Sequence, residues 1–197
     1  MLGTQMVAKG LDFPKVSVVG VLGADSAMNS NDYRSFERSF SLLTQVFGRA
    51  GRGETKGTAI IQTIDPASNL IKLAASQDYD SFYKSEIAIR KMTIYPPYCD
   101  IVQIGIQSGI RDSAQETANK IFDNITKLVK SDYQDVKLII LGSTVASLPK
   151  VSNTYRFRLI LKTKNSKRLR EMLRKATDFR KEKDVSVFID INPEKII

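Results

Sequence analysis

The first hundred residues alternate between apolar runs and amphipathic stretches. The run Val16–Gly23 predicts a buried strand, and the run Thr58–Thr63 predicts a second strand. Between them, Tyr33–Ala50 predicts a helix, because its large apolar residues recur at steps of three and four and would form one core-facing stripe. The stripe consists of Phe36, Phe40, Leu43, Phe47 and Ala50.

Two further helices are predicted ahead of a pair of prolines. Asp65-Pro66 has the form of an N-cap followed by proline at the first helical position, which predicts a short helix toward Ala75. A longer helix is predicted over Asp80–Met92 and must end before Pro96-Pro97, because adjacent prolines force an extended segment. Strands that alternate with helices favour a mostly parallel α/β layer.

The two prolines also predict a boundary between a domain over residues 1–97 and a domain over residues 98–197. In the second domain, Ser113 and Glu116 have the spacing of a capping box at a helix start. The order of predicted elements is that of a split-βαβ, ferredoxin-like sandwich. The elements are a strand over Ile101–Ile106, a helix over Ser113–Val129, strands over Val136–Leu141 and Tyr155–Leu161, a helix over Lys167–Lys181 and a strand over Val185–Ile191, with Pro149 in the loop that joins the second and third strands.

The strand that begins at Tyr155 alternates aromatic and cationic residues. Period two places Tyr155 and Phe157 on one face and Arg156 and Arg158 on the other. We expect the aromatic side chains to belong to the core rather than to stack on bases. The arginine face, together with Lys167 and Arg170 on the following helix, is predicted to bind DNA phosphates, and an acidic peptide is the alternative ligand.

Composition narrows the class of protein. No apolar run approaches the roughly 20 residues of a membrane span, and the N-terminus does not predict a signal peptide. The chain has one cysteine, Cys99, and no histidine, which argues against a disulfide framework and against any metal site. We therefore expect a cytoplasmic protein that does not bind membranes.

Positive charge is concentrated in one segment. Residues 150–184 contain thirteen Lys or Arg residues and four Asp or Glu residues. This excess equals the net charge of +9 of the whole chain. Such a segment attracts polyanions, most commonly nucleic acid. The alternative is a solvated helix face beside a strand edge guarded by Lys and Arg.

The end of the predicted helix Tyr33–Ala50 has the residues of a phosphate-binding motif. The pattern is Gln45-x-x-Gly48-Arg49-x-Gly51-Arg52. At 100° per residue, Gln45, Arg49 and Arg52 fall nearly on one line, opposite the apolar stripe. Arginine grips phosphate oxygens with two parallel hydrogen bonds, whereas the alternative is an ordinary basic helix end followed by a glycine turn. No Gly-x-x-x-x-Gly-Lys-Ser/Thr phosphate loop accompanies the motif.

These motifs resemble those of superfamily-2 helicases. Gly3-Thr4 with Lys9-Gly10-x-Asp12-Phe13-Pro14 is similar to their motif V, and the Gln45-to-Arg52 pattern is similar to their motif VI. Together with Asp32-Tyr-Arg-Ser-x-Glu37-Arg38, Tyr95-Pro-Pro-Tyr98, Leu141-Gly142 and Pro149-Lys150, they resemble the primosomal replication-restart helicases over essentially the whole chain.

The resemblance implies roles for individual residues. Arg49 and Arg52, with Gln45 beside them, would stabilise charge on the transferring γ-phosphoryl group. Asp12, Gly10 and Gly48 would contact the nucleotide or organise the loop around it. Thr4 and Lys9 would contact the DNA backbone or relay the nucleotide state to it. Residues 1–97 would be the C-terminal portion of a RecA-like helicase lobe 2.

The same resemblance implies an ATP-dependent 3′–5′ DNA helicase that acts at stalled or abandoned replication forks and helps to reload the replisome. ATP and Mg²⁺ would be held mainly by a lobe upstream of Met1, so we expect no ATP hydrolysis by this chain alone, and zinc only in an upstream segment. The implied partners are forked and single-stranded DNA, the acidic tail of single-stranded DNA-binding protein and other primosome proteins. The alternatives are a non-enzymatic nucleic-acid-binding adaptor and another superfamily-2 translocase.

Overall fold

The computed structural model describes residue 3 and residues 17–28, 32–49 and 57–196. The chain divides into two compact units, Met1–Ile89 and Arg90–Ile197. The division falls within helix α5 (Tyr79–Thr93), ahead of Pro97, where the sequence pattern predicts the boundary. The last turn of α5 belongs to the second unit, because the Lys162 ammonium donates a hydrogen bond to the Thr93 carbonyl there.

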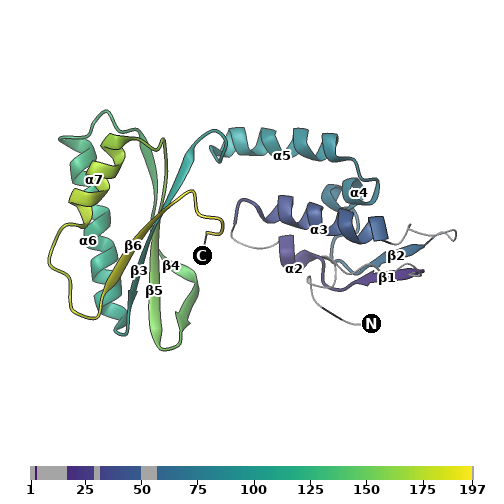
Figure 1. Ribbon diagram of the computed structural model, residues 1–197, viewed down its shortest axis with the longest axis horizontal. Helices are drawn as coiled ribbons and strands as arrows, with labels where there is room; N and C mark the ends of the chain where they lie inside the picture. Colours follow the sequence, from purple (N-terminus) through teal and green to yellow (C-terminus); the bar gives the residue numbers. More distant parts are fainter. Residues whose placement is uncertain (1–2, 4–16, 29–31, 50–56, 197) are drawn as a thin grey trace. The chain divides into compact units, whose positions relative to one another are not determined.

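The first unit contains the predicted strand–helix–strand order. Strands β1 (Val18–Val21) and β2 (Thr58–Ile61) pair in parallel, with Val18 opposite Thr58. Helices α2 (Asp25–Met28), α3 (Ser35–Arg49) and α4 (Asn69–Ala75) accompany them, as Figure 1 shows. The predicted strands and the predicted parallel pairing are confirmed for the described residues, whereas the short α2 was not predicted. The predicted burial of the first strand is wrong, because the residues of β1 are half-buried or exposed and Val18 is 58% exposed.

The apolar stripe of α3 is only partly as predicted. Phe40 and Leu43 are buried, and the Phe40 ring stacks on the Phe82 ring with centroids 4.1 Å apart. Phe36, in the first turn, is 48% exposed and lies outside this core, whereas Val46 is buried. Helical periodicity therefore located the buried side of α3 but not the point along the helix where the core begins.

Two predicted helix caps are wrong. Asp65 accepts a hydrogen bond from the Ala67 backbone N–H at 3.0 Å in a turn ahead of α4, whose N-cap is Ser68. Helix α6 (Arg111–Lys130) begins before Ser113, and the Ser113 hydroxyl donates to Glu182 at 2.5 Å. The Asp65 side chain is engaged in a local turn, which competes with capping. The Ser113 hydroxyl is instead engaged by Glu182, which is distant in sequence.

The second unit has the predicted β-α-β-β-α-β order. Its four strands form an antiparallel sheet in the order β4-β5-β3-β6. Helices α6 and α7 lie on the same side of this sheet (Figure 1). The elements are β3 (Asp100–Ser108), α6, β4 (Leu138–Val151), β5 (Thr154–Thr163), α7 (Lys167–Thr177) and β6 (Ser186–Ile191).

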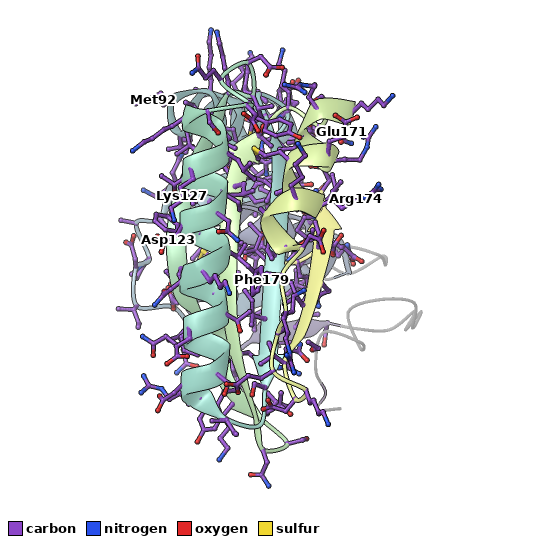
Figure 2. The ribbon with its side chains drawn as sticks, turned by 90° about the vertical axis from the view of Figure 1, so that its left-hand side faces the viewer. Met92, Asp123, Lys127, Glu171, Arg174 and Phe179 are labelled. Carbon is purple, nitrogen blue, oxygen red and sulfur yellow. The ribbon has the colours of Figure 1, made fainter. Side chains whose placement is uncertain are left out.

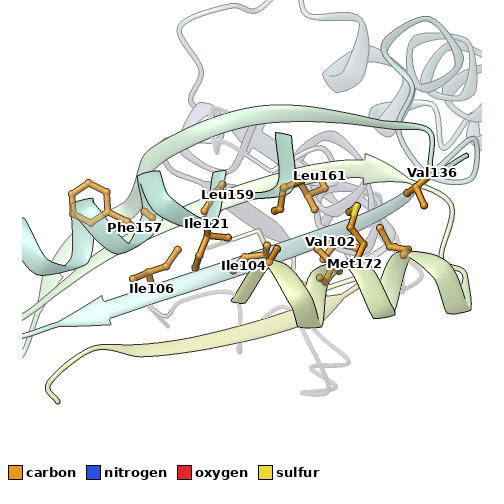
Figure 3. Close-up of a cluster of buried hydrophobic side chains, with 14 of the residues drawn as sticks. Val102, Ile104, Ile106, Ile121, Val136, Phe157, Leu159, Leu161 and Met172 are labelled. Atoms are coloured by element: carbon orange, nitrogen blue, oxygen red, sulfur yellow. The ribbon is translucent and has the colours of Figure 1, made fainter. Parts of the chain in front are cut away.

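The core of this unit lies between the sheet and the two helices (Figure 3). Alternate residues of β3 and β5 point into it, and Ile104 lies directly opposite Leu159. From the helices, Ile121 and Met172 enter the same cluster with no exposed surface. Burial of each such side chain stabilises the fold by about 1.5–3 kcal/mol. The predicted core position of Phe157 is confirmed, whereas Tyr155 is only half-buried and lies outside this cluster, so its predicted core position is wrong.

Strand β4 is longer than predicted. It continues through Pro149 to Val151, with irregular pairing between Ile140 and Ser143 and between Val145 and Lys150. An edge strand tolerates proline and bulges because one of its sides pairs with no other strand. The predicted loop between the second and third strands is therefore wrong. A two-residue turn, Ser152-Asn153 with positive φ at both residues, connects β4 to β5 instead.

Candidate nucleic-acid interface

The face of the four-stranded sheet turned away from α6 and α7 is called here the outer sheet face. On β5, Phe157, Leu159 and Leu161 point toward the helices. Alternation along the strand therefore places Arg156, Arg158, Ile160 and Lys162 on the outer sheet face. Four cationic and apolar side chains of one strand thus line a surface that neither α6 nor α7 covers.

At one end of the outer sheet face the side chains are covered by other residues of the protein, and at the other end they are accessible. These ends are called here the covered end and the open end. At the covered end, Ile101, Gln103 and Ile160 are buried. At the open end, the side chains are half-buried or exposed. They are Thr144, Arg156, Arg158, Gln107, Ser186 and Phe188.

Lys162, at the covered end, is used by the fold itself. It is 9% exposed, and its Nζ donates to the Thr93 carbonyl at 2.6 Å and lies 3.6 Å from the centroid of the Tyr95 ring. Burial lowers the pKa of the Lys162 ammonium. This cation therefore joins the segment after α5 to the sheet and is not available to an external phosphate.

Arg156 and Arg158, at the open end, have no such partners. The Nε and Nη1 atoms of Arg158 and the Nε atom of Arg156 are buried without a hydrogen-bond partner among the residues that the structure describes. Burial lowers the pKa of Arg158. A buried N–H without an acceptor costs about 1–3 kcal/mol, so both side chains favour an external anion. Both residues are only half-buried as a whole, so part of each side chain is accessible, and guanidinium groups donate well to phosphate oxygens.

A second cationic surface lies on α7. Ser166 caps this helix, since its side chain accepts from the Leu169 backbone N–H at 3.0 Å. Lys167, Arg170 and Arg174 recur at steps of three and four on the exposed side, and Figure 2 shows Arg174 projecting outward from the helix. This spacing places the three cations along one line on the helix surface.

Arg168, on the same helix, is occupied. Its guanidinium donates to both carboxylate oxygens of Asp135 at 3.3 Å and lies 4.4 Å from the centroid of the Tyr133 ring. The hydrogen bond to Asp135 raises the pKa of Arg168. Arg170 donates to the Asn165 side chain at 2.7 Å but stays exposed, so it keeps donors for an external ligand.

The two cationic surfaces lie on opposite sides of the unit. Arg156 and Arg158 are on the outer sheet face, whereas Lys167 and Arg170 are on the helix layer, and the hydrophobic core lies between them. The basic segment 150–184 therefore does not form one surface in the fold, although it is continuous in the sequence.

The motif residues of the first unit are only partly described. Gln45 is exposed on α3, and its Nε2 donates to the Ser41 hydroxyl at 3.2 Å. Gly48 has room for a side chain, because a Cβ there would meet only Gln77 at an ordinary 3.6 Å. Arg49 is the last residue of α3, and its side chain lies outside the described part. Thr4, Lys9, Gly10, Asp12 and Arg52 lie outside the described residues.

The stretch Asp32–Arg38 has a structural role that sequence reasoning missed. The Asp32 carboxylate is buried and accepts from the Arg34 backbone N–H and from Arg38 Nη1, both at 2.9 Å. These contacts hold the turn that leads into α3. The pairing therefore sets where this helix begins, and with it the position of Gln45.

Sequence reasoning also missed Phe188 on β6. Val187 and Ile191 belong to the core side of this strand, so Ser186, Phe188 and Asp190 occupy the opposite phase. On this face of β6, Phe188 is aromatic whereas Ser186 and Asp190 are polar. The Phe188 side chain is 43% exposed. An apolar residue out of phase in a short strand was the signal that could have found it.

Comparison with known proteins defines the class. A family model described as the primosomal protein N C-terminal domain matches residues 91–194, more than half of the chain, and the chain belongs to this family. Proteins named replication restart protein PriA are similar to it. The protein from Bacillus subtilis is 39% identical over 98% of the chain, that from Synechocystis 38% over 82%, and that from Borreliella burgdorferi 32% over 100%. The chain covers 24%, 19% and 29% of these relatives, respectively.

No helix among the described residues has the length and apolar character that crossing a bilayer requires. The family match coincides with the unit Arg90–Ile197, which contains both cationic surfaces.

Proposed function

We propose that this chain belongs to an ATP-dependent 3′–5′ DNA helicase of replication restart, and that the unit Arg90–Ile197 is one of its DNA-contacting parts. The observation that carries the proposal is the pair Arg156 and Arg158, two guanidinium groups at the open end of the outer sheet face without a described hydrogen-bond partner. Relatives named for replication restart make DNA the first polyanion to test.

The first unit, within the predicted domain over residues 1–97, is proposed as part of a RecA-like lobe 2. Gln45, exposed on the side of α3 away from Leu43, fits a contact with a nucleotide held by another lobe. Arg49 and Arg52 would stabilise the γ-phosphoryl group, while Gly10, Asp12 and Gly48 would surround the nucleotide. Thr4 and Lys9 would contact the DNA backbone. ATP with Mg²⁺ would supply the energy for translocation.

The helix α7 surface is proposed as a second DNA contact through Lys167 and Arg170. The acidic tail of single-stranded DNA-binding protein is its second candidate ligand, because exposed cations at helical spacing bind carboxylates as well as phosphates. Other primosome proteins complete the proposed set of partners.

The test is fluorescence anisotropy of a labelled fork DNA titrated with the chain at about 50 and 200 mM salt. Binding through several phosphates weakens steeply with salt, because each neutralised phosphate releases counterions. We expect tight binding at low salt and a loss of affinity of about tenfold or more at high salt. No binding at low salt, with intact fold by circular dichroism, would sink the proposal that this chain contacts DNA by itself.

A further inference from the structure

Phe188 lies over the backbone of the neighbouring strand. A Cβ built on Gly105 of β3 would stand 2.1 Å from Cζ of the Phe188 ring and 2.2 Å from Cε1. The ring thus occupies the space that a side chain of residue 105 would fill. Gly105 and Phe188 are directly paired across β3 and β6, and Arg158 of β5 is paired with Gly105 on its other side.

An aromatic ring that covers a glycine stabilises a sheet, and this explains why Gly105 stands opposite Phe188. It does not explain the environment of the ring. Phe188 is 43% exposed, and no described aromatic ring stacks on it. Its neighbours toward the open end of the outer sheet face are cationic and polar: Arg158 in the same row and Arg156, Gln107 and Ser186 in the next. An exposed ring in such surroundings gains no core packing from them.

The positive charges near the Phe188 ring lie on one side of it, and a negative charge lies on the other side. β3 separates β6 from β5, so the backbones at Phe188 and Arg158 are two strand spacings apart, about 10 Å. The ring leans over β3 and covers part of that distance. On β6 itself, the exposed carboxylate of Asp190 lies two residues from Phe188, opposite Gln103 and away from Arg156. A polyanion on this face is therefore favoured toward Arg156 and Arg158.

We propose that Phe188 stacks against a base of single-stranded DNA whose phosphates contact Arg156 and Arg158. The inference rests on the proposed DNA-binding function and names the form of DNA and the stacking residue. Aromatic side chains on a four-stranded sheet stack on unpaired bases, and cations beside them hold the backbone. A base in a duplex is already stacked and does not expose a free face, so the ring selects single strands.

The chain contains no tryptophan, which allows a direct test. Phe188→Trp introduces a single indole at the proposed stacking position, and its emission is followed while oligo(dT) is added. We expect saturable quenching with the same midpoint as binding measured by anisotropy of labelled oligo(dT). Phe36→Trp is the matched control, because Phe36 is similarly exposed at 48% but lies on α3. Its emission is expected to stay constant.

Affinity provides the second readout. Phe188→Ala is expected to weaken binding of oligo(dT) by about tenfold and binding of a blunt duplex by less than about twofold. Phe36→Ala is expected to change neither. An equal loss on both DNAs would overturn the base-stacking assignment.

The outcomes separate this inference from the proposed function. Constant Phe188→Trp emission while anisotropy shows bound DNA would refute stacking and leave DNA binding intact. Quenching by an acidic peptide but not by oligo(dT) would assign the surface to a protein tail. No binding of any DNA by the unmodified chain would refute both proposals.

Discussion

At the residue scale, the outer sheet face shows how neighbouring cations of one strand take different roles. Lys162 and Arg158 are on the same face of β5, four residues apart. The Lys162 ammonium is bound by the Thr93 carbonyl and the Tyr95 ring, whereas two nitrogens of Arg158 are buried without a described acceptor. The first contributes to folding, and the second is the one that we propose for binding.

Replacing Lys162 therefore separates stability from DNA binding. Lys162→Met keeps the unbranched stem but removes the ammonium that donates to the Thr93 carbonyl. We predict a loss of about 1–3 kcal/mol in the free energy of unfolding, measured by urea denaturation, and a change in DNA affinity of less than about twofold. Lys164→Met, at an exposed position, is the control. Weaker DNA binding with unchanged stability would contradict the role given to Lys162.

Asp100 gives a prediction for the dependence of stability on pH. Its carboxylate accepts from the Asn165 backbone N–H and from the Asn192 side chain, both at 2.8 Å, and these hydrogen bonds lower the pKa of Asp100 below 3.8. A folded-state pKa below the unfolded value means that the stabilisation is present above the unfolded pKa and is lost as the pH falls through the folded one.

We predict that Asp100→Asn lowers the urea midpoint at pH 7 and that the gap to the unmodified chain shrinks at about pH 2.5. The measurement is a series of urea titrations across this range. A gap of the same size at both pH values would show that the ionised form of Asp100 is not the stabilising one.

At the element scale, the start of α7 tests whether a single N-cap side chain stabilises a helix of this fold. Ser166→Ala removes the acceptor of the Leu169 N–H, and we predict a loss of about 1 kcal/mol in the free energy of unfolding, with only a few tenths lost in Ser166→Gly. Urea denaturation measures both. Equal losses in the two variants would argue against capping, because glycine is tolerated at an N-cap and alanine is not.

The strands and helices of the second unit could be predicted because their periodicity is strong. β5 alternates without interruption, and α7 repeats its apolar residues at helical spacing, so pattern alone identified both. β4 could not be predicted in full, since its irregular pairing around Gly142 and Pro149 depends on being an edge strand. The cap at Ser113 failed because the partner of its hydroxyl, Glu182, is 69 residues away.

The candidate site was predictable in part for the same reasons. Arg156 and Arg158 follow from the alternation of β5 alone. The Lys162 ammonium is engaged through its hydrogen bond to the Thr93 carbonyl. The position of the Phe188 ring depends on the pairing of Phe188 with Gly105. Both are contacts between elements distant in sequence, which local pattern does not contain.

At the scale of the whole molecule, the positive charge is divided between two surfaces of one unit. Residues 150–184 supply both the outer sheet face and the exposed side of α7, on opposite sides of a hydrophobic core. One strand of DNA that contacts both would have to pass around the unit. We therefore expect the two surfaces to contribute independently to DNA affinity.

The central claim is that Arg156 and Arg158 bind DNA phosphates, and one measurement tests it most directly. The salt dependence of fork-DNA affinity is compared between the unmodified chain, Arg156→Gln/Arg158→Gln and the control Lys127→Gln/Lys130→Gln. The control removes the same charge from exposed positions on α6, where Figure 2 shows Lys127. We predict a slope of log affinity against log salt that is smaller by about 1.5 in the arginine variant, and an unchanged slope in the control. Equal slopes in all three proteins would contradict the claim.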